Sequence, residues 1–237
     1  MESKVVLITA ASAAMGQLYT RKMLEQGWRI AALEVNHAGL DALPNSSTLL
    51  SMNGDITEEE AVIPSVRKMH TELDSVHCVV NAAGIMPTSR ILDQEIDLTE
   101  IKYGGLVSFA HVNLQDLLER KRGEFISFES LARHLSTSYI SAYNASKFAV
   151  IADIEVLYQK NKGKDVNFTC ICPPPVQTPL LKQTRKTVYP KIFGVFRTLS
   201  PETVITKIGR ALTNSKLWIS PGSATKFSWL FRRFYQA

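Results

Sequence analysis

Short apolar runs rich in β-branched residues alternate with amphipathic helical segments along most of this 237-residue chain. A strand that is apolar along its whole length is buried on both faces, and intervening helices cover those faces. The alternation is therefore typical of a parallel sheet with a helix between successive strands. Strands are predicted at 5–9, 28–33, 48–52, 76–80, 124–128, 166–172 and 217–219, and helices at 16–25, 58–73, 100–120, 143–160 and 201–212.

These elements predict one α/β domain over residues 1–237, since the length is ample for one core and short for two. We expect a doubly wound, Rossmann-like parallel sheet of about seven strands with helices on both faces. Residues 174–200 combine prolines, cations and aromatics without periodicity, which predicts a substrate-covering loop. Residues 223–237 form a C-terminal tail beyond the last predicted strand.

Tyr143 and Lys147 lie one turn apart on one face of the predicted helix 143–160. Ser130 precedes Tyr143 by 13 residues and follows an apolar strand. An ammonium stabilises a tyrosinate, so a phenol with a reference pKa of about 10 exchanges protons closer to neutral pH. A serine to hold an oxygen, a tyrosine to protonate it and a lysine to tune the tyrosine indicate carbonyl–alcohol interconversion. A chance Tyr-x-x-x-Lys pair is the alternative, and the motifs around the pair oppose it.

The first predicted strand runs into a turn of small residues at 9–16, and a helix follows. Amides at such a helix N-terminus bind a pyrophosphate. Dinucleotide-binding turns use glycine so that the backbone approaches the phosphates closely. Here Gly16 is present, while Ala10 and Ala14 occupy two glycine positions. Alone, the pattern fits a plain strand-to-helix turn equally well.

Glu34 closes the second predicted strand, about twenty residues beyond the turn, where an acidic residue accepts hydrogen bonds from an adenosine ribose. Its charge would repel a 2′-phosphate, and neither Ala13 nor Val35 supplies a cation to bind one. NAD is therefore favoured over NADP. An exposed acid at a strand end is the alternative, and the spacing favours the ribose.

Polar turns also follow the third and fourth predicted strands. Ligands of open parallel sheets bind outside the carboxyl ends of the strands, so both turns are candidate cofactor contacts. Taken singly, each is an ordinary strand-ending turn. The residues concerned are Asp55, Ile56, Asn81, Ala82, Ala83 and Gly84.

In their order and spacing these motifs resemble the short-chain dehydrogenase/reductase family over nearly the whole chain. Segment 173–178 matches the family's Pro-Gly-x-Val-x-Thr motif, which in the family holds the nicotinamide carboxamide. The resemblance implies an NAD(P)-dependent oxidoreductase that transfers a hydride between nicotinamide and an alcohol or ketone. It implies that Ser130 holds the substrate oxygen, Tyr143 is the acid/base, and Lys147 tunes Tyr143 and binds the nicotinamide ribose. The implied cofactor contacts are Thr9, Ala11, Ser12, Met15, Gly16, Glu34, Asp55, Ile56, Asn81, Ala82, Ala83, Gly84, Tyr143, Lys147, Pro173, Val176 and Thr178.

The sequence departs from the family pattern at three places. Two turn glycines are alanine, and Pro174 replaces a glycine, removing an N–H and fixing φ. The helix asparagine of the family's proton relay is missing near Lys102 and Tyr103, so a relay would need one of these residues or water. These departures favour an alternative function as a weakly active or inactive relative that senses nucleotides or binds partners. The complete Ser130, Tyr143 and Lys147 set opposes it.

Composition narrows the partners and the compartment. The net charge of +5 is mild, and its excess in the last third of the chain suggests an anionic ligand or surface there rather than a nucleic-acid stripe, with a solvated face as the alternative. The family resemblance implies a small-molecule alcohol or carbonyl substrate, and the apolar residues of segment 174–200 fit a lipophilic one or the packing of that segment onto the body. Three cysteines in strand-like runs indicate reduced thiols and a cytoplasmic location. Cys170 and Cys172 lack a nearby histidine or second cysteine pair, so core packing is favoured over a metal site.

Two segments predict further contacts. The helices 100–120 and 143–160 carry apolar residues on more than one face, and family resemblance implies a homodimer or homotetramer through them. The tail segment 227–235 contains five aromatics and two arginines. Such a segment can enter a membrane interface, close the substrate pocket or pack between subunits. We favour docking within the protein over membrane contact.

Overall fold

Seven parallel strands form one sheet in the computed structural model, which describes residues 4–93, 103–131, 139–184, 197–212 and 216–221. Their order is β3-β2-β1-β4-β5-β6-β7, and every neighbouring pair is parallel. The predicted single-domain, doubly wound α/β fold is confirmed. The strands are β1 Val5–Thr9, β2 Arg29–Glu34, β3 Leu49–Asn53, β4 Cys78–Asn81, β5 Arg122–Phe128, β6 Asp165–Ile171 and β7 Trp218–Ile219.

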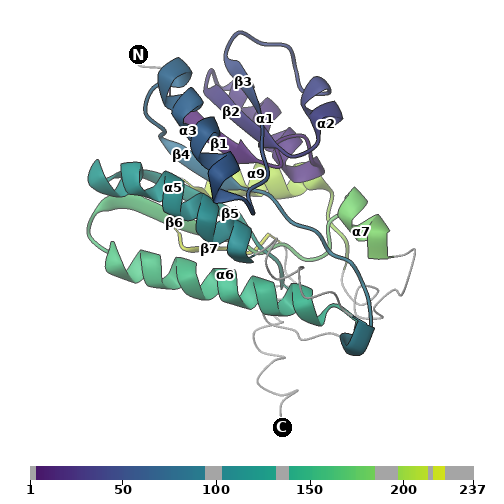
Figure 1. Ribbon diagram of the computed structural model, residues 1–237. Coiled ribbons are helices and arrows are strands. Elements are labelled where there is room, and N and C mark those ends of the chain that lie inside the picture. The colour runs from purple at the N-terminus through teal and green to yellow at the C-terminus, as the bar shows by residue number, and fades with distance from the viewer. Residues whose placement is uncertain (1–3, 94–102, 132–138, 185–196, 213–215, 222–237) are drawn as a thin grey trace.

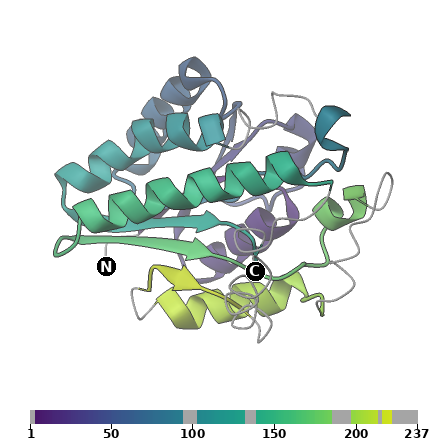
Figure 2. The same cartoon turned by 90° about the horizontal axis from the view of Figure 1, so that it is seen from below.

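Helices cover both faces of the sheet, as Figures 1 and 2 show. On one face lie α3 (Glu59–Leu73), α5 (Gly105–Glu119) and α6 (Ser141–Lys160), and on the other lie α1 (Ala14–Glu25), α2 (His37–Asp41) and α9 (Pro201–Leu212). The β1 side chains alternate between these layers, with Leu7 in the first core and Ile8 in the second. Burial on both sides is why the central strands β1 and β4 are almost wholly apolar, whereas the edge strand β3 exposes Ser51 and Asn53.

Most element ends lie within two residues of the predicted positions, and β1 and α9 match them. β5 begins at Arg122 because it pairs with β6 along its whole length. α2 was not predicted, since five residues are too few to show a helical period. It begins after Asn36, whose side chain accepts a hydrogen bond from the Ala38 amide at 3.1 Å.

The predicted covering loop at 174–200 contains a short helix, α7 (Pro179–Thr184), and a bridge between Val176 and Leu199. Segment 185–196 of that loop and the tail at 223–237 lie outside the described residues. The described part of the connection between β4 and α5 includes one 3-10 turn, η1 (Ile91–Asp93).

The connections change direction at β1. From β1 the chain continues outward to β2 and β3, and it then crosses to β4 on the other side of β1. The carboxyl ends of β1 and β4 therefore flank the crevice where open α/β sheets bind their ligands. Thr9 ends β1 and Asn81 ends β4, so the predicted site motifs reach this crevice.

Candidate active site

The turn after β1 adopts a tight conformation despite its alanines. Ala10 has a left-handed backbone with φ of 48°, and its carbonyl accepts a hydrogen bond from the Ala13 amide at 3.0 Å. Gly16 lies against this carbonyl, because a β-carbon at Gly16 would stand 2.2 Å from the Ala10 oxygen. No side chain caps the N-terminus of α1, so its first amides remain suited to an anion. Met15 packs at the edge of the adjoining core.

Glu34 joins the end of β2 to the turn. Its Oε2 accepts hydrogen bonds from the Ser12 amide at 3.2 Å and from the Ser12 hydroxyl at 2.5 Å. Its Oε1 accepts from the amides of Val35 and Asn36 at 3.1 and 3.4 Å. The sequence predicted a bond to a ribose, and the fold adds a role that it did not suggest: the carboxylate fixes the turn itself.

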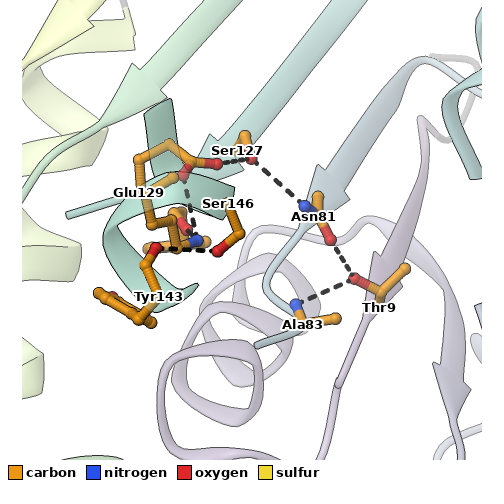
Figure 3. A network of polar contacts seen from close by, with 9 residues as sticks. Thr9, Asn81, Ala83, Ser127, Glu129, Tyr143 and Ser146 are labelled. Atoms are coloured by element: carbon orange, nitrogen blue, oxygen red, sulfur yellow. Dashed lines mark hydrogen bonds and ion pairs between the residues drawn. The ribbon is translucent and has the colours of Figure 1, made fainter. Parts of the chain in front are cut away.

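A buried polar network connects the ends of three neighbouring strands (Figure 3). The Thr9 hydroxyl donates to Asn81 Oδ1 at 3.0 Å and accepts from the amides of Ala82 and Ala83 at 3.1 and 3.2 Å. Asn81 Nδ2 donates to the Ser127 hydroxyl at 3.3 Å. The network fixes the path of the chain after β4, where Gly84 is exposed and a β-carbon would meet open space.

Asp55 has a local role at the end of β3. Its Oδ1 accepts from the Thr57 amide at 2.9 Å and from the Thr57 hydroxyl at 2.8 Å, which shapes the turn into α3. Ile56 next to it approaches α5, because a β-carbon at Gly105 would lie 3.0 Å from the Ile56 side chain.

Tyr143 and Lys147 occupy the first turns of α6, and both are buried. The Lys147 ammonium nitrogen is 5.9 Å from the centre of the Tyr143 ring and donates to the Phe128 carbonyl at 2.9 Å. The Ser130 side chain hydrogen-bonds Tyr143. The three predicted catalytic residues therefore come together beside the carboxyl end of β5.

Glu129 is a site residue that the sequence reasoning missed. Its buried carboxylate lies at the end of β5, with Oε2 3.1 Å from Lys147 Nζ. Its Oε1 accepts a hydrogen bond of 2.5 Å from the Ser127 hydroxyl (Figure 3). The available signal was an acidic residue directly after an apolar strand and directly before Ser130.

The electrostatic balance at Tyr143 differs from the expected one. Burial raises the pKa of the phenol, while the Lys147 ammonium and the Ser130 hydrogen bond lower it. The Glu129 carboxylate and Cys172 raise it again, and the pKa of Tyr143 lies above its ordinary value. Lys147 acts in the predicted direction, and it is outweighed.

The pKa of Lys147 is also raised, although burial acts on it in the opposite direction. Burial lowers the pKa of the ammonium, but Glu129, Tyr143 and Cys172 raise it, and the pKa lies above its ordinary value. Lys147 is therefore charged throughout the neutral range.

The segment after β6 lies beside the catalytic residues that follow β5. The Pro173 carbonyl accepts a hydrogen bond from the Leu131 amide at 3.0 Å, which holds this segment beside the residues that follow β5. The buried Thr178 turns back on Val176, donating from its amide to the Val176 carbonyl at 2.8 Å. Pro174 is accommodated here with a trans peptide bond.

Of the two residues considered for a proton relay, Tyr103 is in the described part of the chain, just before α5. Tyr103 donates a hydrogen bond to Asp153 on α6, which raises the pKa of the phenol. The buried Asn113 donates to the Phe109 carbonyl one turn earlier on α5, at 2.7 Å. Lys102 lies outside the described residues. Among the described residues, no group of three or more His, Cys, Asp or Glu side chains could hold a metal ion.

An apolar groove of about 600 Å³ runs between α5 and α6. Val107 on α5 and Val156 on α6 border it, with 42% and 51% of their surfaces exposed. No helix in the described part of the chain is long and apolar enough to cross a bilayer.

Comparison with known proteins agrees with this architecture. The family profile for short chain dehydrogenases matches residues 4–188. The chain belongs to this family of oxidoreductases, as the motifs predicted.

Two relatives show which characterised dehydrogenases this sequence is similar to. Estradiol 17-beta-dehydrogenase 11 of Rattus norvegicus is 25% identical over 98% of this chain and 80% of the relative. L-fucose dehydrogenase of Mus musculus is 27% identical over 76% of this chain and 68% of the relative.

Solved structures share the fold. A short chain dehydrogenase/reductase from Burkholderia phymatum in complex with NAD has a TM-score of 0.85 at 19% identity, covering 98% of this chain and 94% of that one. The 3-ketoacyl-(acyl-carrier-protein) reductase from Brucella melitensis complexed with NADH has a TM-score of 0.83 at 19% identity, covering 93% and 98%.

Proposed function

We propose that this protein is an NAD-dependent dehydrogenase/reductase acting on an alcohol or ketone. The observation that carries the proposal is the convergence of Ser130, Tyr143 and Lys147 beside the β1–β4 crevice. In this proposal Ser130 holds the substrate oxygen and Tyr143 donates or accepts the proton on that oxygen. Lys147 orients the phenol and binds the nicotinamide ribose.

When bound, NAD would accept the hydride in alcohol oxidation, and NADH would donate it in ketone reduction. The turn at 9–16 would hold the pyrophosphate, Asp55 and Ile56 the adenine, and Val176 and Thr178 the carboxamide. Glu34 supports a preference for NAD over NADP, since its carboxylate stands beside the turn and would repel a 2′-phosphate.

The substrate that we propose is a lipophilic alcohol or its ketone. The similarity to estradiol 17-beta-dehydrogenase 11 supports this class, and L-fucose and 3-ketoacyl thioesters represent the alternatives named by other relatives. The experiment is a binding titration of NADH and NADPH by fluorescence, followed by hydride-transfer assays with a steroid, a sugar and an acyl thioester panel. Tight NADH binding without turnover of any substrate would favour the inactive, nucleotide-sensing alternative.

We also propose a homodimer or homotetramer through the α5–α6 groove. Its apolar lining and the exposed Val107 and Val156 support a self-association surface. A cytoplasmic location is proposed because Cys78, Cys170 and Cys172 are buried and are not joined in disulfides, which fits a reducing compartment.

A further inference from the structure

Glu129 brings a negative charge into the buried part of the active site. Both members of its ion pair are almost fully covered, with 6% of the Lys147 side chain and 0% of the Glu129 side chain exposed. The groups that face this pair are the Tyr143 phenol from α6 and the Cys172 thiol after β6. The ammonium and the carboxylate carry opposite charges and balance each other.

The ion pair also determines how many N–H donors of Lys147 are already bound to protein acceptors. An ammonium has three N–H donors. One is given to the Phe128 carbonyl at 2.9 Å, and a second faces Glu129 Oε2 at 3.1 Å. Among the described residues, these two acceptors leave the third donor for a ligand, and they hold the ammonium against the end of β5.

The Glu129 carboxylate is itself held in place by hydrogen bonds. Ser127 donates to Glu129 Oε1, and Asn81 donates to Ser127, so the carboxylate continues the network that begins at Thr9 (Figure 3). A shift of Glu129 would break hydrogen bonds inside the sheet, where unsatisfied polar groups are costly.

We propose that Glu129 is a positioning residue of the active site, which fixes the Lys147 ammonium and sets the charge balance of the Tyr143–Lys147 pair. The proposal rests on the proposed function and deepens it. A carboxylate at 3.1 Å favours every protonated group around it, so Glu129 makes the pair retain its protons to higher pH. Alcohol oxidation, which needs the ionised phenol, would then have its optimum shifted towards alkaline pH.

The first test needs neither cofactor nor substrate. Tyrosine Cζ and lysine Cε carbons are labelled with ¹³C, and their NMR shifts are followed with pH in the wild type and in Glu129→Gln. Spectra of Tyr143→Phe and Lys147→Met assign the two signals. We expect the first proton lost from the Tyr143–Lys147 pair to leave about one pH unit or more lower in Glu129→Gln. An unchanged first deprotonation overturns the proposal.

Glu124→Gln is the matched control, because Glu124 is a partly buried carboxylate on β5, the strand that Glu129 directly follows. It should leave the first deprotonation of the Tyr143–Lys147 pair unchanged. An equal downward shift in Glu124→Gln would indicate a general effect of net charge and would also overturn the proposal.

The second readout is the pH profile of kcat/KM for alcohol oxidation. In Glu129→Gln its rising limb should move to lower pH by the same amount as the NMR titration. A shift in the NMR titration without turnover of any substrate would retain the role of Glu129 and reject the proposed function. Turnover of a substrate with an unchanged rising limb in Glu129→Gln would retain the proposed function and reject the role of Glu129.

The proposal can also be tested if Glu129→Gln fails to fold. Glu129→Gln leaves a buried ammonium without its counter-charge, which is more damaging than the loss of both charges. If Glu129→Gln does not fold, the double variant Glu129→Gln/Lys147→Met should fold, as circular dichroism and urea unfolding would show. Failure of the double variant as well would overturn the proposal, since the ion pair would then not be the cause.

Discussion

Tyr143 holds its proton more tightly in this fold than a free phenol does. Burial and the Glu129 carboxylate raise its pKa, and together they outweigh Lys147 and Ser130. At neutral pH the phenol is therefore in its acid form, the form that donates a proton to a substrate oxygen. A lysine one turn away on a helix is readable from sequence, whereas the sign of this balance depends on how deeply the pair is buried.

Tyr143→Phe should remove oxidoreduction while leaving the fold intact. The variant deletes a hydroxyl and keeps the ring, so the expected loss in kcat is about 10²–10⁴-fold, the contribution of a positioned acid/base. NADH affinity should change little. Tyr158→Phe on the same helix, at a partly buried position away from Ser130, is the control and should retain wild-type turnover. Near-wild-type turnover in Tyr143→Phe would contradict the assigned role.

Gly16 is the turn residue that tolerates a side chain least. A β-carbon there would stand 2.2 Å from the Ala10 carbonyl oxygen, so the backbone of the turn would have to move. Gly27 is a useful comparison: its φ is 78°, and a β-carbon would meet nothing within 4 Å. Gly27→Ala therefore measures the left-handed conformational cost alone, about 1–2 kcal/mol.

Gly16→Ala should lower the free energy of unfolding by more than Gly27→Ala does, and only Gly16→Ala should weaken NADH binding. Urea unfolding and fluorescence titration measure the two effects. Equal losses in the two variants would show that the turn relaxes around the added methyl.

At the scale of elements, continuous apolar runs predicted all seven strands because parallel strands are buried on both faces. The period of 3.6 residues predicted the long helices and could not reveal α2, which has five residues. Glu129 was missed for a different reason: its partner Lys147 lies 18 residues away, and only the fold, which brings the first turns of α6 to the end of β5, places the two charges together.

The α5–α6 groove supports a prediction about assembly. Val156→Glu places a charge on a helix face that is half exposed in the monomer, so the variant should fold normally. In a dimer the same carboxylate would be desolvated without a partner, which is costly. Light scattering at micromolar concentration should therefore show an oligomer for the wild type and a lower mass for Val156→Glu. Leu92→Glu is the control, since Leu92 is 93% exposed outside the groove. A monomeric wild type would reject the interface.

At the scale of the whole molecule, one polar network and one crevice connect the cofactor side of the site to the catalytic side. Thr9 and Asn81 fix the ends of β1 and β4, and Ser127 and Glu129 extend the network to Lys147. The order of the motifs along the chain was sufficient to predict the family and the sheet edge on which they meet. It could not show that Glu34 and Asp55 also hold local turns, because those hydrogen bonds depend on backbone conformation.

Because the cofactor side and the catalytic side of the site belong to one folded unit, cofactor binding should raise the melting temperature of the whole protein. A ligand that binds only the folded chain stabilises it by about 2.7 kcal/mol at a concentration 100-fold above its Kd. For a domain of this size that corresponds to an increase in Tm of about 5–11 °C. We expect NADH to produce this increase and NADPH at equal concentration to produce a smaller one, because the Glu34 carboxylate stands beside the turn. Tyr143→Phe should show nearly the same increase as the wild type, since it keeps the aromatic ring and every other cofactor contact and loses only the proton-transferring hydroxyl. A larger increase with NADPH would mean that Glu34 is committed to Ser12 and does not face the ribose.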